Sequence, residues 1–165
     1  MRESVLLSLL AVIALLLQTT VLPRVAIGRA TPDLLLIMCV YLGLHQHTVG
    51  GAVGAFLLGY LQDAFSGSVI GLNAFSMCLV FSVVYLTSRR LWVDNTLSQI
   101  VLVFLASLLK TVTVLILVAI FLPVDGWWHT LLPSAFLQAG LAAIISPPFF
   151  ALLAQTQGLA VEEQE

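Results

Sequence analysis

Long stretches without a charged side chain limit most strongly what this sequence can fold into. Residues 34–62 contain no Asp, Glu, Lys or Arg, and neither do residues 64–88. Of the whole chain 61% is apolar and only 8% is charged, whereas a soluble domain carries about a quarter charged residues because its surface faces water. The sequence therefore predicts an integral membrane protein. A net charge of −2 also argues against nucleic-acid binding, which needs a clustered basic face.

Breaks in the apolar pattern divide the chain into predicted helices. A helix that crosses a bilayer needs about 20 residues, so 165 residues leave no room for a separate soluble domain. We expect one multi-pass domain over residues 1–165, an all-α integral membrane protein built as a six-helix transmembrane bundle. The predicted spans are approximately residues 4–22, 33–44, 48–62, 72–88, 97–122 and 132–153, and residues 155–165 are expected to form a short acidic cytoplasmic tail.

The stretch over residues 33–62 leaves the number of spans open between five and six. It is too long for one straight helix across a core of about 30 Å, so it either breaks near His45–Gly51 into two short helices or forms one kinked span. Counting Lys and Arg places the Arg89/Arg90 loop and the C-terminus in the cytoplasm in both cases. Six spans, which we favour, also place the N-terminus there.

The third predicted helix has a face of small residues. Gly51, Ala55, Gly59 and Asp63 recur every four positions and therefore share one side of a helix. In lipid, small side chains let two helix backbones approach closely. The face is expected to receive a neighbouring helix, which belongs either to the same chain or to a partner protein, and it is also compatible with a homo-oligomer.

Lys110 is a charged residue near the middle of the span predicted over residues 97–122. A central Lys is costly in a bilayer unless it finds partners, and such residues usually face the interior of the protein. Lys110 is therefore a functional candidate, or a structural residue satisfied by the hydroxyls of Ser107, Thr111 and Thr113. Asp63 is expected to be a poor partner, because it ends its own helix about 20 Å away in depth.

A second group of polar residues falls in the outer half of the predicted bundle: Gln18, Asn73, Ser76 and Gln138. These side chains either line an outward-opening cavity or form hydrogen bonds between helices, and we favour the hydrogen bonds. No motif of a hydrolase, a zinc enzyme or a phosphate-binding loop occurs. We therefore predict no catalytic residue, no metal site and no cofactor.

Two segments of the chain resemble the MreD family of rod shape-determining membrane proteins. One is Pro32 to Leu36, and the other is Asp63 to Leu72, whose turn composition comes from Ser66, Gly67 and Gly71. The small hydrophobic chain, a first helix ending in Leu-Leu-Gln at Gln18, and the Gly-rich third helix agree with this family. The likeness covers about the first ninety residues.

The resemblance implies a non-enzymatic scaffold of the cell-elongation complex in the bacterial inner membrane. Such a scaffold binds MreC and, through it, works with MreB filaments and the RodA/class B transpeptidase synthase that builds lateral peptidoglycan. We expect the Gly51/Ala55/Gly59 face and the linker after it to contribute to MreC binding. The resemblance also implies the fold of the substrate-binding subunits of energy-coupling-factor transporters, and a vitamin-binding transport subunit is the alternative function.

Overall fold

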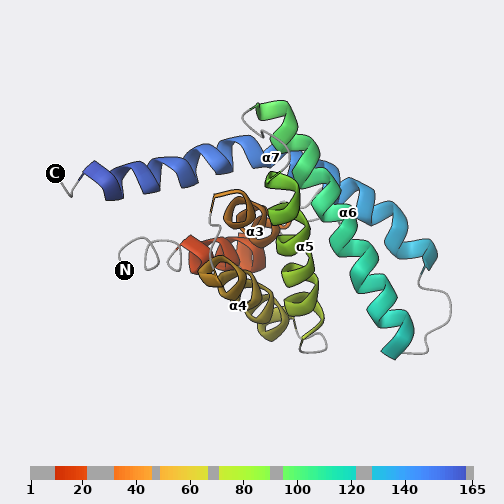
Figure 1. Cartoon of the computed structure of the whole chain (residues 1–165). Coiled ribbons are helices and arrows are strands. Elements are labelled where there is room, and N and C mark those ends of the chain that lie inside the picture. Colours follow the sequence, from red (N-terminus) through yellow and green to blue (C-terminus); the bar gives the residue numbers. More distant parts are fainter. Residues whose placement is uncertain are drawn as a thin grey trace.

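The computed structural model describes residues 10–21, 32–45, 49–66, 71–89, 95–121 and 128–162. At residues 21, 66, 121, 128–135 and 156–162 it describes the backbone only. Within these residues the protein is all-helical, which confirms the predicted class (Figure 1). The first helix, residues 10–21, ends in the π-helical turn η1. The elements are η1 (Leu17–Val21), α3 (Leu34–His45), α4 (Val49–Ser66), α5 (Leu72–Ser88), α6 (Thr96–Phe121) and α7 (Trp128–Glu162).

The uncharged stretch after Asp33 forms two helices. α3 ends at His45 and α4 begins at Val49, and the two helices contact each other. α4 continues to Ser66, beyond the end predicted at residue 62. α7 likewise continues to Glu162, so residues 155–162 are helical where a tail was expected. Five residues of this segment favour helix, namely Gln155, Gln157, Leu159, Ala160 and Glu162, which is compatible with the extension.

α3 lies at the centre of the fold. All residues from Leu34 to Gly43 are buried, and the helix contacts α4, α5, α6 and α7. A helix that is apolar on every side is typically enclosed by protein. Its 12 residues span about 18 Å at 1.5 Å per residue, which is less than the thickness of a bilayer core. α3 is therefore a short interior helix covered by its neighbours.

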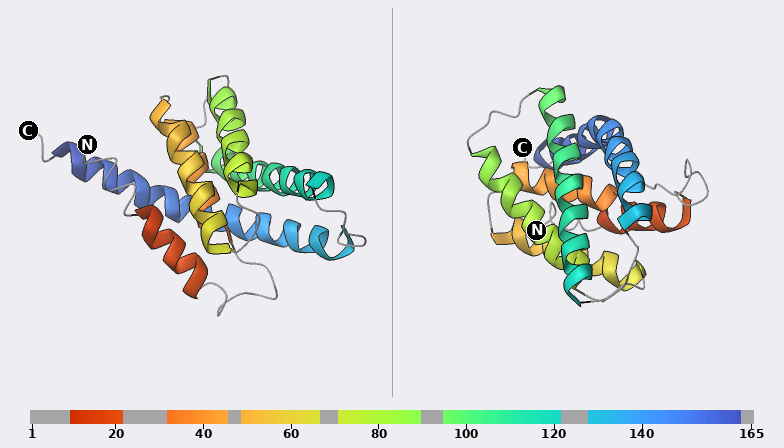
Figure 2. Two further views of the ribbon diagram at one scale, coloured as in Figure 1. Left: turned by 90° about the horizontal axis from the view of Figure 1, so that it is seen from below. Right: turned by 90° about the vertical axis from the view of Figure 1, so that its right-hand side faces the viewer.

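Two segments of the described residues are long and apolar enough to cross a membrane. They are Thr96–Ile120 in α6, with a mean hydropathy of 2.6, and Phe136–Gln155 in α7, with a mean hydropathy of 1.8. The described parts of the other four helices are apolar but shorter. α6 and α7 pack against each other, and α7 bends as it runs across the direction of α4 and α5 (Figures 1 and 2). The helices therefore do not all run side by side.

α6 has two different faces. Large apolar side chains on one face are exposed, among them Leu105, Val112 and Ile116. The opposite face is buried and carries Val103, Ala106, Lys110 and Thr113. An apolar outer face and polar groups turned inward are the arrangement expected for a helix surrounded by lipid. This arrangement places Lys110 in the interior.

Candidate functional site

Asp33 starts α3 and caps it. Its backbone carbonyl accepts a hydrogen bond from the Ile37 amide at 3.3 Å, and its Oδ1 accepts one from the Leu36 amide at 3.1 Å. A carboxylate at this position satisfies amides that have no partner in the first turn of a helix. The side chain is buried, so its negative charge needs a partner in the interior.

Lys110 supplies that partner. Its Nζ forms an ion pair with Asp33 Oδ2 and donates a hydrogen bond to Gln62 Oε1 at 2.8 Å. Gln62 Nε2 in turn donates to Asp33 Oδ2 at 3.2 Å. The three side chains close a triangle that joins α3, α4 and α6. We call Asp33, Gln62 and Lys110 the polar triad.

Gln18 extends the triad to the first helix. Its Nε2 donates to Asp33 Oδ1 at 3.3 Å. Its Oε1 is buried and has no hydrogen-bond partner among the described residues. A buried acceptor without a partner loses its hydration without compensation, which is energetically costly.

The partners of Lys110 differ from the expected hydroxyls. Thr111 Oγ1 donates to the Ser107 carbonyl at 3.0 Å, and Thr113 Oγ1 donates to the Leu109 carbonyl at 2.8 Å. These hydroxyls therefore bond within α6. The expected depth separation between the end of α4 and Lys110 is also wrong, because Gln62, the residue before Asp63, contacts Lys110 directly.

Sequence reasoning did not identify Asp33 or Gln62 as site residues. One signal was present: an interior Lys in a membrane protein usually pairs with a carboxylate, and Asp33 opens an uncharged stretch. The sequence did not indicate at which depth in the membrane each helix begins and ends. α3 begins beside the middle of α6, which no span-by-span division of the sequence indicates.

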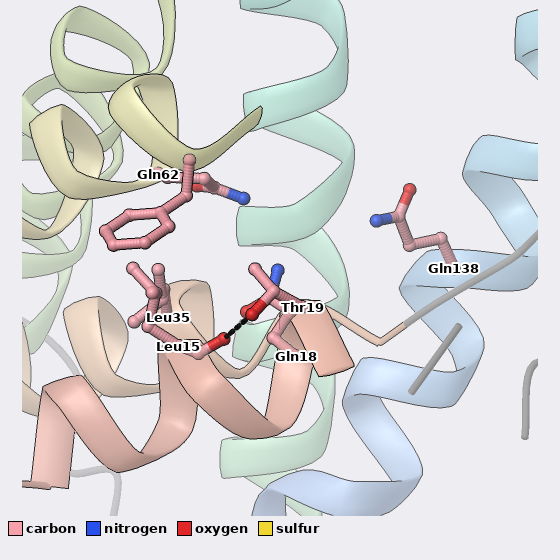
Figure 3. A pocket seen from close by; sticks show the side chains of 7 residues that line it. Leu15, Gln18, Thr19, Leu35, Gln62 and Gln138 are labelled. Carbon is pink, nitrogen blue, oxygen red and sulfur yellow. Dashed lines mark hydrogen bonds between the residues drawn. The ribbon is translucent and has the colours of Figure 1, made fainter. Parts of the chain in front are cut away.

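A cavity of about 250 Å³ borders the polar triad (Figure 3). Gln18 and Thr19 of the first helix, Gln62 of α4 and Gln138 of α7 contribute polar side chains, and the described residues that line the cavity are Leu15, Gln18, Thr19, Leu35, Gln62, Phe65 and Gln138. Figure 3 shows Gln138 on the opposite side of the cavity from Gln62 and Gln18. The cavity therefore opens between helices that are far apart in the sequence.

Two of the four residues proposed for a polar cavity lie elsewhere. Gln18 and Gln138 line the cavity, whereas Asn73 and Ser76 do not. Asn73 Nδ2 donates to Asp63 Oδ1 at 2.9 Å, and Ser76 Oγ donates to the Leu72 carbonyl at 2.8 Å. Both residues lie in the first turns of α5, where their polar groups form hydrogen bonds with Asp63 and with the local backbone.

The small-residue face of α4 is buried inside the chain. Gly51, Ala55, Gly59 and Asp63 are all buried. A Cβ added at Gly59 would lie 2.5 Å from Ala74 Cα and 2.6 Å from the Asn73 carbonyl oxygen, so α4 and α5 touch backbone to backbone there. This approach requires glycine.

Asp63 ties the end of α4 to the start of α5. Its Oδ2 accepts hydrogen bonds from the amides of Gly71 at 2.8 Å and Ala74 at 3.2 Å. Its Oδ1 accepts one from the Asn73 amide at 3.1 Å, besides the bond from Asn73 Nδ2. A carboxylate is favourable at a helix N-terminus, because the free backbone amides there donate hydrogen bonds to it and the positive end of the helix dipole stabilises its negative charge.

Of the three linker residues in the sequence pattern, Ser66, Gly67 and Gly71, the structure describes Gly71 fully, Ser66 in part and Gly67 not at all. Gly71 adopts a φ of 104° at the N-terminus of α5, a conformation that glycine adopts without strain. Ser66 is the last residue of α4, and its side chain is not described. Gly67 lies outside the described residues.

Comparison with known proteins assigns the family. The model of the family described as rod shape-determining protein MreD matches residues 2–156, nearly the whole chain. Searches of curated proteins and of solved structures each found no match, so the expected likeness to the transporter-subunit fold has no support. MreD is a family of shape-determination membrane proteins and not a known enzyme family. The chain therefore belongs to the MreD family, and it is an integral inner-membrane protein with a role in rod shape determination.

Proposed function

We propose that this protein is a non-enzymatic scaffold that binds MreC within the membrane. Through MreC it would couple MreB filaments to the RodA/class B transpeptidase synthase. The family match supports the general role in rod shape, and it does not favour the alternative of a transporter subunit. We further propose that the Arg89/Arg90 loop and both ends of the chain are cytoplasmic, following the positive-inside rule.

The observation that carries this proposal is the set of contacts by which the second half of α4 is attached to its neighbouring helices. Gly59 packs on the backbone of α5, Gln62 bonds to both members of the buried ion pair, and Asp63 binds the first amides of α5. One short segment of α4 thus fixes α3, α5 and α6 relative to one another. A scaffold needs such a fixed geometry, because its task is to present a surface of constant shape.

The opposite side of α4 is the surface that we propose for MreC. Its exposed side chains are apolar, namely Val53, Phe56, Leu57 and Tyr60. The rings of Phe56 and Tyr60 stack with centroids 6.4 Å apart. Aromatic side chains provide large, stiff contact areas, so this pair offers a defined anchor. The small-residue face contributes indirectly, by setting the position of α4 on α5.

Co-purification of MreC tests the proposal with two kinds of variant. Gly59→Leu pushes α4 away from α5, whereas Gly140→Leu adds a side chain whose Cβ has no atom within 4 Å and serves as the control. Tyr60→Ala removes an exposed ring without filling the interior. We expect Gly59→Leu and Tyr60→Ala to lose MreC while the protein stays in the membrane, and Gly140→Leu to retain it. Normal recovery of MreC with both test variants would contradict the proposal.

A further inference from the structure

The cavity beside the polar triad has a buried floor and an accessible rim. Leu15 and Leu35 of the floor are 3% and 1% exposed, whereas Phe65 at the rim is 60% exposed. Thr19 is also exposed, and Gln18, Gln62 and Gln138 are intermediate. A molecule could therefore enter past the rim and reach the glutamines from outside.

The orientation of the Gln18 amide follows from its surroundings. Its Nε2 donates to the Asp33 carboxylate, and a flipped amide would turn its oxygen toward the same negative charge. The carboxylate therefore fixes the NH₂ group on its side, which leaves Oε1 as the buried acceptor without a partner in the described part of the chain. Gln62 is fixed in the same way, with its NH₂ group on Asp33 and its oxygen on Lys110.

The polar atoms at the cavity favour a ligand that donates hydrogen bonds. Gln18 Oε1 has almost no accessible surface, so a ligand in the cavity does not reach it. Thr19 Oγ1 gives its proton to the Leu15 carbonyl at 2.9 Å, so toward a ligand it acts as an acceptor. The Gln138 amide, on the far side in Figure 3, offers both a donor and an acceptor. A hydroxyl group satisfies either kind of partner, and several hydroxyls could engage Thr19 and Gln138 at once.

The charge of the lining and the volume of the cavity restrict further which ligands can bind. Among the described residues the lining contains no charged side chain, and the charges of Asp33 and Lys110 behind it already compensate each other. An ion would therefore meet no countercharge from these residues on entering. A volume of about 250 Å³ equals roughly eight waters at about 30 Å³ each and lies below the usual range of drug-sized sites. It suits one small group.

We propose that this cavity binds an uncharged group with several hydroxyls, held by Thr19 and Gln138. Two sources share this chemistry: the glycerol headgroup of a phospholipid and a free polyol. The site is independent of MreC binding, because neither Thr19 nor Gln138 belongs to the exposed face of α4. Because Gln18 also bonds to Asp33, an occupant would contact the network that joins the first helix to α3.

Two arms of one experiment on the purified full-length protein test this proposal and separate the sources. In the first arm, native mass spectrometry measures retention of phosphatidylglycerol and of phosphatidic acid with the same acyl chains, which is anionic but lacks the headgroup hydroxyls. In the second arm, millimolar glycerol is added to protein in phosphatidic acid micelles and the melting temperature is measured. Gln138→Leu removes a ligand contact. Gln155→Leu, an exposed position on the same helix, is the control.

A lipid headgroup in the cavity predicts tighter retention of phosphatidylglycerol than of phosphatidic acid. Gln138→Leu should weaken that retention about three- to tenfold, the range for one lost hydrogen bond, and Gln155→Leu should not. A free polyol predicts a rise in melting temperature with glycerol that Gln138→Leu abolishes. If neither arm depends on Gln138, the cavity holds only water and the proposal is wrong.

Discussion

Lys110 of α6 and Asp33 at the start of α3 form a buried ion pair although 77 positions separate them in the sequence. Their side chains are only 10% and 5% exposed. Lys110 lies near the middle of α6, so α3 begins beside the midpoint of a membrane-capable helix. This explains how α3 can be so short: it occupies the interior of the protein, where its neighbours replace lipid on every side.

Lys110→Met should destabilise the protein by about 3–5 kcal/mol, the cost of leaving one member of a buried ion pair without its partner. The Asp33 carboxylate would remain buried with only amide donors. The free energy of unfolding can be measured by titrating sodium dodecyl sulfate into mixed micelles. Thr111→Val, which removes a hydroxyl bonded within α6, should change little. Equal stability of Lys110→Met and the unmodified protein would mean that Lys110 reaches solvent instead.

Gly59→Ala should destabilise the protein by about 1–3 kcal/mol, the usual cost of overpacking a tight interior. The added methyl group meets backbone atoms of Ala74 and Asn73, and a backbone cannot rotate away as a side chain can. Gly140→Ala has open space around its Cβ and should be neutral or slightly stabilising, since alanine favours helix. Thermal unfolding of both variants in one detergent measures the difference. A smaller loss for Gly59→Ala than for Gly140→Ala would refute the close approach of α4 and α5.

Asp63→Asn should loosen the junction between α4 and α5. The carboxylate accepts hydrogen bonds from three backbone amides and from Asn73 Nδ2, whereas an amide would direct an NH₂ group at some of these donors. Hydrogen exchange of the amides at Asn73 and Ala74 should therefore accelerate. Ser82→Ala, which removes a hydroxyl bonded to the Cys78 carbonyl in its own helix, is the control. Unchanged exchange at both amides in Asp63→Asn would show that Asp63 does not hold the junction.

The membrane class and the helix order could be predicted from the sequence because both depend on local composition. Stretches without charge and the breaks between them indicate where helices lie. The turn glycine Gly71 and the small-residue face of α4 are likewise local patterns. Gly71 directly precedes α5, and Gly59 of the face packs on the backbone of α5. The sequence left open whether that face meets the same chain or a partner, and Gly59 packs against α5 of its own chain.

The site could be predicted only in part, because it depends on relative depth. Lys110 was identifiable as an interior charge, but its partners lie on helices whose ends meet the middle of α6. The cavity likewise joins Gln18 and Gln138 and excludes Asn73 and Ser76, although all four are uncharged polar residues in apolar segments. Tertiary packing alone decides which of these residues meet.

A double-mutant cycle between Asp33 and Lys110 tests most directly the claim that this pair holds the scaffold together. Asp33→Asn, Lys110→Met and the combined variant would be unfolded in the same micelles as the unmodified protein. A coupled pair predicts that the combined variant loses less stability than the two single losses added together, by about 1 kcal/mol or more, because it leaves no uncompensated charge. Additive losses would contradict the account.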